Sequence, residues 1–496
     1  MQSPSLNRGV LHSTFMKVGI IQNSPRTADF SNNLRHIVQG YRACLDHGAE
    51  LVVASAHALC GPGLYDLATR DSFRKQMKLA LETLSRELGT APLILGAYST
   101  REEGDFAWED EESSSFSPTL TPYFLENDVV EELTNGELLE WENRRIFITT
   151  QDTPVQPGLD SFDMIVHLGA EPWYAALLQQ EEIARQNEAL NNEAAVVHAA
   201  CVSTAESFVY GGGSGIYSPT GKTLMRLPWF DAESRVTDIA PPYREASTTK
   251  ETEAATLARM LQQGIRDTVR QYGYGGVCLS MDSPNSTLLA ALAIDALGSA
   301  NVEGVSFGNG EDSARQLGIS CRTLDIAPML QQANELLGNE EEYTLKARIQ
   351  ASLLSTHSDS RGLLLLCPLS RREIMLGHFT LYGESCGMLA PLGNLYDMDL
   401  HMLQQEYRER YSHIFGTLAE PEAPQKDIIL HALADCNVSA GRFIRENNFG
   451  LEENEVHQVQ RKLIASALKR SQLPFTLQVS APDEQLRIPS AHRLND

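Results

Sequence analysis

In the first half of the chain, short apolar runs alternate with amphipathic stretches. Residues 17–21 and 51–53 have the length and the apolar character of buried strands, and residues 31–47 between them have helical spacing that ends near Gly48. A second helix, ending at Gly89, is predicted where large apolar residues recur every three or four positions, at Phe73, Met77, Leu81, Leu84 and Leu88. Further strands are expected near 92–95, 145–149, 163–167, 195–202 and 207–210, with a helix near 176–193.

The second half repeats a strand, loop and helix order. A helix with one apolar face runs from near Leu257 to Gly273. It is followed by a predicted strand at 276–279, a helix at 288–297 and further strands at 303–306, 321–325 and 363–367. This alternation predicts a parallel, doubly wound sheet.

A proline-rich and then polar stretch separates the two halves. It predicts a domain boundary, because few contacts cross such segments. We therefore expect an N-terminal extension at 1–15, a first domain at 16–240, a linker at 241–256 and a second domain at 257–496.

The amino-acid composition excludes some classes of binding partner and of site. Asp and Glu number 65 against 40 Lys and Arg, a net charge of −25, which argues against nucleic acid as the main partner. No apolar run is long enough to predict a membrane span, and residues 101–116 are acidic and serine-rich, as in an exposed loop. The eight cysteines are scattered without zinc spacing, so we expect reduced residues of a cytoplasmic protein and no metal site.

Several longer motifs carry a family resemblance. Two of the most informative are His-Gly-Ala-Glu-Leu-Val-Val at 47–53 and Ala-Pro-Leu-Gly-Asn-Leu-Tyr at 390–396. The others lie, in chain order, at 17–22, 212–214, 219–222, 288–298, 322–326, 346–349, 379–384 and 469–474. Together they resemble glutamine-dependent NAD synthetase. The resemblance implies an α/β protein, in which a nitrilase-like α-β-β-α sandwich precedes a doubly wound ATP-pyrophosphatase-like domain.

The resemblance also implies where an amidase site should lie. A nitrilase-type glutaminase uses a glutamate base, a lysine that stabilises the oxyanion and a cysteine nucleophile. In this sequence Ala56 stands at the position of the base and Thr150 at that of the nucleophile. We therefore expect no working glutaminase.

The positions of the lysines and cysteines in the first half of the chain agree with that expectation. No lysine occurs between Lys78 and Lys222, and no cysteine between Cys60 and Cys201, so no triad can be assembled in the family order. One alternative is a rebuilt nucleophile–base pair of Cys60 and His57. The other is that Cys60 is a small residue lining a vacated pocket.

The synthetase half has a changed phosphate loop. The family loop reads Ser-Gly-Gly-x-Asp-Ser, whose glycines let backbone N–H groups surround pyrophosphate. Here residues 281–286 read Met-Asp-Ser-Pro-Asn-Ser, which contains no glycine and has a proline that removes one donor. Asp282, Ser283 and Ser286 could bind a phosphate or an ion weakly at a helix N-terminus, or could simply cap that helix.

Four residues further along match family positions associated with the dinucleotide or ATP. They are Arg348, Glu373, Thr380 and Lys469, and each could equally be kept for structural reasons. Asp397 stands where the family has a lysine, a reversal of charge.

The resemblance implies a degenerate NAD synthetase: a nucleotide-binding, regulatory or assembly protein linked to NAD biosynthesis. Its implied ligands are ATP with Mg²⁺, bound weakly, and NAD or deamido-NAD. Its implied partners are further copies of itself or an active NAD synthetase. The alternative is a diverged ATP-dependent amide ligase that makes NAD from deamido-NAD with ammonia or glutamine. In that alternative Asp282, Ser283, Glu373 and Thr380 would do the work. A third possibility is a purely structural partner without a small ligand.

Overall fold

The computed structural model describes residues 16–100, 119–151, 154–158, 161–175, 177–247, 251–338, 342–415, 424–446 and 450–479. The extension at 1–15 and the acidic loop predicted at 101–116 lie outside these residues. The chain forms two compact units. Unit 1 comprises Met1–Glu171, Gln179–Ser203 and Tyr210–Thr249, and unit 2 comprises Pro172–Leu178, Thr204–Val209 and Lys250–Asp496.

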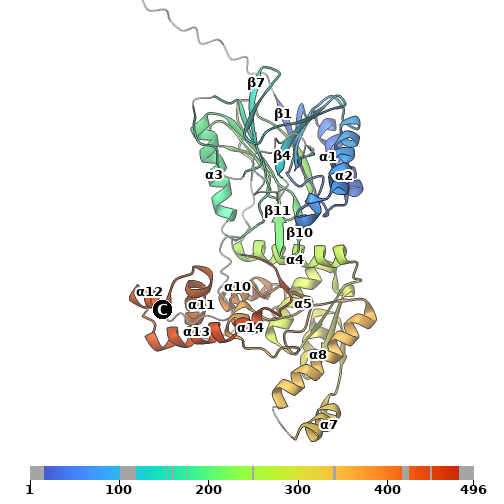
Figure 1. The fold of residues 1–496 in the computed structure, drawn as a ribbon, viewed down its shortest axis with the longest axis vertical. Helices are drawn as coiled ribbons and strands as arrows, with labels where there is room; N and C mark the ends of the chain where they lie inside the picture. Colours follow the sequence, from blue (N-terminus) through green and yellow to red (C-terminus); the bar gives the residue numbers. More distant parts are fainter. Residues whose placement is uncertain are drawn as a thin grey trace, which may run out of the picture. The chain divides into compact units, whose positions relative to one another are not determined.

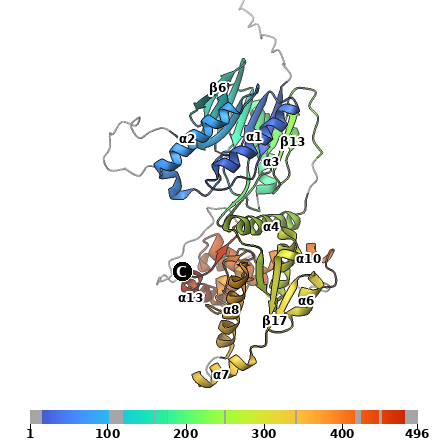
Figure 2. The ribbon, with the colours of Figure 1, turned by 90° about the vertical axis from the view of Figure 1, so that its right-hand side faces the viewer.

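Two six-stranded sheets form the centre of unit 1 (Figures 1 and 2). The first has the order β14 (Glu233–Asp238), β1 (Lys17–Gln22), β2 (Leu51–Ala54), β3 (Leu93–Tyr98), β4 (Leu120–Glu126) and β5 (Val129–Glu132). The second has the order β13 (Thr223–Arg226), β12 (Gly215–Tyr217), β9 (Ala195–Ala199), β8 (Met164–Leu168), β7 (Arg144–Thr149) and β6 (Glu137–Trp141). A separate hairpin pairs β10 (Val202–Ala205) with β11 (Phe208–Gly211).

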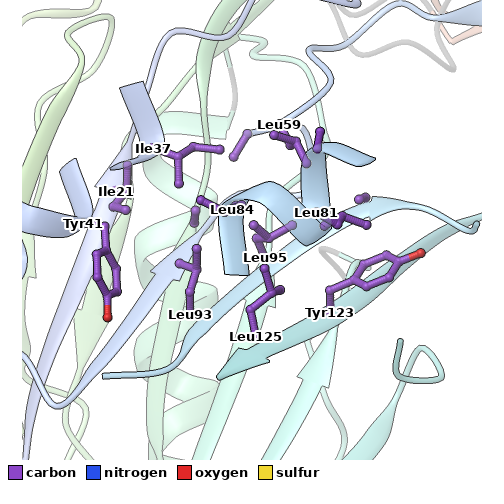
Figure 3. Packing of buried hydrophobic residues seen from close by; sticks show 14 of the residues in the cluster. Ile21, Ile37, Tyr41, Leu59, Leu81, Leu84, Leu93, Leu95, Tyr123 and Leu125 are labelled. Carbon is purple, nitrogen blue, oxygen red and sulfur yellow. The ribbon is translucent and has the colours of Figure 1, made fainter. Parts of the chain in front are cut away.

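Helices cover the outer face of each sheet, which gives the predicted α-β-β-α layers. On the first sheet lie α1 (Phe30–Asp46) and α2 (Asp71–Arg86), with the short 3₁₀ helix η1 (Tyr65–Thr69) before α2, and α3 (Leu177–Asn192) lies on the second. Figure 3 shows the core under α1 and α2, a single cluster that includes Ile37 and Tyr41 of α1 and Leu93 of β3. Each large apolar side chain buried in this way contributes about 1.5–3 kcal/mol.

Unit 2 is built on a parallel sheet. Its order is β17 (Ser320–Thr323), β16 (Val302–Ser306), β15 (Val277–Ser280) and β18 (Leu364–Leu365). The chain moves outward from β15 through α5 (Pro284–Leu297), the 3₁₀ turn η3 (Ser299–Asn301) and α6 (Gly310–Leu317), and then returns to the far side of β15 through α7 (Ala327–Leu337) and α8 (Glu342–Arg361). Because crossovers are right-handed, this reversal places helices on both faces, as in the predicted doubly wound sheet.

The remaining elements of unit 2 surround this sheet. They are α4 (Glu253–Tyr272), α9 (Arg371–Leu376), β19 (Leu389–Ala390), α10 (Asp397–Arg408), α11 (Pro424–Leu430), the π-helical turn His431–Asp435, α12 (Ala440–Arg445), α13 (Glu453–Ala465), α14 (Ala467–Arg470) and β20 (Phe475–Thr476). The Thr252 side chain caps α4, which begins at Glu253. The first turn of the helix therefore includes residues 253–256, which belong to the predicted linker. No helix within the described ranges is both long and apolar enough to cross a membrane.

Candidate functional site

The two amidase positions are buried and serve the scaffold. Ala56 follows β2 and belongs to the core between the two sheets, and a Cβ added at Gly96 would lie only 2.6 Å from the Ala56 Cα. Thr150 follows β7. Its backbone N–H donates to Asn135 Oδ1 at 2.8 Å and its hydroxyl to the Leu120 carbonyl at 3.4 Å. Ala56 has no group that could act as a base, and the Thr150 hydroxyl is bonded to a backbone carbonyl.

The alternative pair of Cys60 and His57 has unfavourable chemistry. Cys60 is fully buried, and this burial raises the pKa of its thiol well above the usual range. Because the thiolate is the nucleophile, a thiol that stays protonated reacts poorly. The His57 ring packs edge-on against Tyr210 at 5.6 Å. Neither observation supports a rebuilt pair of Cys60 and His57.

In unit 2, the loop after β15 caps the next helix. The Ser283 hydroxyl accepts from the Ser286 N–H at 3.1 Å and also bonds to the Ser286 hydroxyl at 2.8 Å. Pro284 occupies the first position of α5, where a missing N–H costs nothing. Ser283 and Ser286 thus act together as a helix cap.

Asp282 is bonded to the end of the neighbouring strand. Its carboxylate accepts from the Ser306 hydroxyl at 2.7 Å, the Phe307 N–H at 2.7 Å and the Gly310 N–H at 3.3 Å. Gly310 permits this approach, because a Cβ there would lie 2.5 Å from the Met281 carbonyl oxygen. Backbone N–H groups at the start of a helix are a natural site for phosphate. In this protein the Asp282 carboxylate accepts the hydrogen bonds of the Phe307 and Gly310 N–H groups.

A cavity of about 670 Å³ opens beside Asp282. It lies at the carboxyl ends of β15 and β16, where parallel α/β sheets bind ligands. Its described lining includes no lysine or arginine and consists of Met281, Asp282, Ser283, Pro284, Thr287, Gly308, Asn309, Gly310, Ser313, Gln404, Ile414 and Phe415.

The other predicted site residues lie around the segment 373–384. Glu373 accepts from the Ser370 N–H at 2.7 Å and from Asn285 Nδ2 at 3.4 Å, and burial raises the pKa of its carboxyl. The Thr380 N–H donates to Glu384 Oε2 at 2.7 Å. Its bond to Asn285 links Glu373 to the first turn of α5. The carboxylates of Glu373 and Glu384 are both already bonded to protein groups.

Two cations of the predicted site bind main-chain carbonyls. The Lys469 ammonium donates to the carbonyls of Gly377 at 3.2 Å and Phe379 at 2.9 Å, and it lies 5.3 Å from the centre of the Phe379 ring. Arg348 Nε donates to the Leu381 carbonyl at 3.3 Å. Both side chains therefore brace the backbone of this segment.

Asp397, at the position of the family lysine, pairs with Arg372 at 2.5 Å. Burial raises the pKa of Asp397 to about 6, although the Arg372 guanidinium acts to lower it. The reversal of charge is thus accommodated by a cation from α9.

These residues do not fit a magnesium-bound triphosphate. The Asp282 carboxylate is already bonded to protein donors, and no group of three His, Cys, Asp or Glu in the described part of the chain could hold a metal ion. A triphosphate also requires cations, which the described cavity lining lacks.

Part of the cavity was not predicted from the sequence. Gln404 comes from α10, and Ile414 and Phe415 follow that helix, more than 120 residues after Asp282. They belong to no motif and have no distinctive spacing. Only their position in the fold identifies them.

Comparisons with known proteins agree with the fold. Residues 257–409 match the family model of NAD synthase. A glutamine-dependent NAD(+) synthetase from Thermotoga maritima is 24% identical over 467 residues, covering 79% of this chain and 81% of the relative. One from Synechocystis sp. is 24% identical over 438 residues, covering 76% and 78%.

Solved structures show the same architecture. The glutamine-dependent NAD(+) synthetase of Cytophaga hutchinsonii has a TM-score of 0.80 at 14% identity, covering 97% of this chain and 98% of its own. That of Acinetobacter baumannii, in complex with ADP, has a TM-score of 0.71 at 19% identity, covering 96% and 98%. The chain therefore contains an NAD synthase family domain and is a homologue of the glutamine-dependent NAD(+) synthetases over most of its length.

Proposed function

We propose that this protein is a non-catalytic homologue of glutamine-dependent NAD(+) synthetase that binds a nucleoside or a nucleoside monophosphate. The observation that carries the proposal is the position of the Asp282 carboxylate. It accepts from Ser306, Phe307 and Gly310 at the end of β16, and so takes the donors that a phosphate chain would need. A second anion placed there would meet a fixed negative charge.

The cavity composition supports a nucleoside ligand. Met281, Pro284, Ile414 and Phe415 provide apolar surface against which a flat heteroaromatic base can pack. The neutral polar side chains of the lining can bond to the edge of a base or to a ribose. Such a lining recognises a purine nucleoside better than a polyphosphate.

Neither half-reaction of an NAD synthetase has its groups in place. Ala56 and Thr150 offer no glutaminase nucleophile or base, and the loop at 281–286 offers no open nest of N–H groups. The proposal therefore predicts no transfer of nitrogen from glutamine.

Assembly with other chains is the route by which such a protein would act. We propose that it forms a homo-oligomer or joins an active NAD synthetase. Exposed apolar side chains on α7 support this, since Leu336 is 88% exposed, Leu337 56% and Met329 48%. Light scattering on the pure protein and on its mixture with an active synthetase tests this part. A monomer in both samples would contradict it.

Titration calorimetry tests the ligand. Adenosine and AMP are expected to bind to the full chain, and ATP with Mg²⁺ to bind at least about tenfold more weakly. Gln404→Ala should weaken adenosine binding, whereas Gln405→Ala, on the exposed side of the same helix, should leave it unchanged. Tighter binding of ATP with Mg²⁺ than of adenosine would overturn the proposal.

The comparisons favour a second candidate, a diverged ligase that makes NAD from deamido-NAD with ammonia or glutamine. The relatives named above are glutamine-dependent NAD(+) synthetases, and they align with about four fifths of this chain. This candidate predicts NAD formation from ATP, Mg²⁺, deamido-NAD and ammonia, with loss of activity in Glu373→Gln and Thr380→Ala. Our proposal predicts no product in the same assay.

A further inference from the structure

Away from the cavity, an exposed cysteine of unit 2 lies beside a histidine, and the other side of the histidine ring faces a buried aspartate. The Cys436 sulfur is 3.5 Å from His431 Nε2, and His431 Nδ1 is 3.2 Å from Asp435 Oδ2. We propose that Cys436 is a reactive thiol, activated by His431 and Asp435, that forms mixed disulfides with small disulfide compounds.

The local backbone explains how the three residues meet. Residues His431–Asp435 form a π-helical turn, and the Cys436 N–H donates to the His431 carbonyl at 3.0 Å, five residues back. In an α-helix, residues five apart point to different sides, whereas this wider turn brings them onto the same side. The turn therefore creates a contact between thiol and imidazole that the sequence spacing alone does not predict.

Asp435 is fixed as the group that orients the histidine. Its carboxylate is buried and accepts from the Tyr396 hydroxyl at 2.6 Å and from the Arg371 guanidinium. Burial alone would raise the pKa of this carboxyl, but its hydrogen bonds and Arg371 hold the pKa below its usual range. A carboxylate only accepts hydrogen bonds, so His431 Nδ1 carries the proton and Nε2 faces the thiol with its lone pair.

The histidine ring is held from a second side. The Tyr396 ring packs edge-on against it, with ring centres 6.4 Å apart. The titratable and charged groups around the pair are Asp435, Tyr396, Arg371 and Asp399 of α10. The two carboxylates stabilise the positive charge that the imidazole gains when it takes the thiol proton, and the Arg371 guanidinium opposes them.

Accessibility separates Cys436 from the other cysteines. Cys436 is exposed, as is 58% of the His431 side chain, whereas the other seven cysteines are buried or partly buried. Burial raises the thiol pKa to about 12 in Cys44, Cys278 and Cys367, and also raises it in Cys321 and Cys386.

The reaction is a thiol–disulfide exchange. The Cys436 proton moves to His431 Nε2, and the thiolate attacks one sulfur of a disulfide R–S–S–R. A new bond forms between Cys436 and that sulfur as the old sulfur–sulfur bond breaks, and the departing R–S⁻ takes the proton back from His431 as R–SH. The Cys436 sulfur is oxidised, the released sulfur is reduced, and no other oxidant is needed.

The test follows the rate of this exchange on the full chain with oxidised glutathione, from about pH 5.5 to pH 9. Peptide mass spectrometry after acid quenching measures the mixed disulfide at each cysteine. We expect Cys436 to react first. Near pH 6, Cys436 of the wild-type protein should react about tenfold faster than Cys436 of the His431→Gln variant. The two rates should converge above about pH 8.5.

The matched control is His401→Gln, which changes another histidine of unit 2 that bonds to Gln405. It should leave the Cys436 profile unchanged, and circular dichroism checks that each variant is folded. Identical pH profiles for the wild-type protein and His431→Gln would overturn the proposal. So would faster modification of Cys321, which is partly exposed but lacks this arrangement.

Discussion

Asp282 accepts hydrogen bonds from Ser306 and Phe307 at the end of β16 and from Gly310 at the start of α6, and in the proposed function this one side chain decides what the cavity binds. If the carboxylate is removed, the Phe307 N–H and the Ser306 hydroxyl lose an acceptor, whereas the Gly310 N–H keeps its bond to Ser306 Oγ at 3.0 Å. The Ser306 side chain is buried, and an unpaired buried donor costs about 1–3 kcal/mol of stability. An anion of the right size would then satisfy both donors.

The corresponding prediction is that Asp282→Ala binds inorganic phosphate at least about tenfold more tightly than the wild-type protein, a change of about 1.4 kcal/mol. Titration calorimetry gives the affinity, and added phosphate should restore part of the lost thermal stability. Asp312→Ala is the matched control, because it removes an equal charge from the exposed first turn of α6. Equal phosphate affinities in all three proteins would refute the prediction.

At the scale of elements, α3 is unusual because one of its faces buries charged side chains. Arg185 donates to Glu188 Oε2 at 3.0 Å and also lies 3.0 Å from Nε2 of His167 on β8. Burial, with the Arg185 charge, lowers the pKa of His167, whose Nδ1 lies 2.9 Å from the Gln151 carbonyl oxygen and whose Nε2 lies 2.9 Å from Glu188 Oε1. The helix thus holds the backbone that follows Thr150.

We therefore expect Glu188→Ala to destabilise unit 1 by about 3–5 kcal/mol, because it removes a carboxylate that is paired with a buried guanidinium. Urea unfolding followed by circular dichroism measures the loss. Asn187→Ala, one residue earlier on the exposed side of the same helix, should change stability by less than about 0.5 kcal/mol. A small effect at position 188 would show that α3 does not depend on this network.

Helices and strands in which apolar residues recur at a regular spacing were predictable from the sequence. The helix predicted at 31–47 is α1 at Phe30–Asp46, and the strand predicted at 303–306 is β16 at Val302–Ser306. The strands from Leu120 to Trp141 were missed, because few of their residues are fully buried and the apolar alternation is weak. The sequence also predicted a changed phosphate loop at Asp282. It could not show that this carboxylate reaches the Phe307 N–H, since such a contact is set by how β15 and β16 pair.

For the molecule as a whole, the scaffold has complete apolar cores, whereas our proposal holds that the chemistry of the family is lost. Unit 1 has complete apolar cores on both sides of its first sheet, and unit 2 has cores around its sheet and its last helices. Core packing determines folding and site residues determine chemistry, so one can persist without the other. The chain as a whole carries a net charge of −25, which acts on any charged ligand that approaches the site.

This net charge gives the proposed ligand site an unusual dependence on salt. AMP carries about two negative charges near neutral pH and is repelled by the chain, whereas adenosine is neutral. The screening length falls from about 30 Å at 0.01 M salt to about 10 Å at 0.1 M, so added salt weakens this repulsion. We expect AMP to bind about two- to fivefold more tightly as salt rises over this range, with adenosine unchanged. Calorimetry at both salt concentrations measures the effect. A phosphate site made of cations would give the opposite trend, so weaker AMP binding at high salt would show that the cavity recognises phosphate after all.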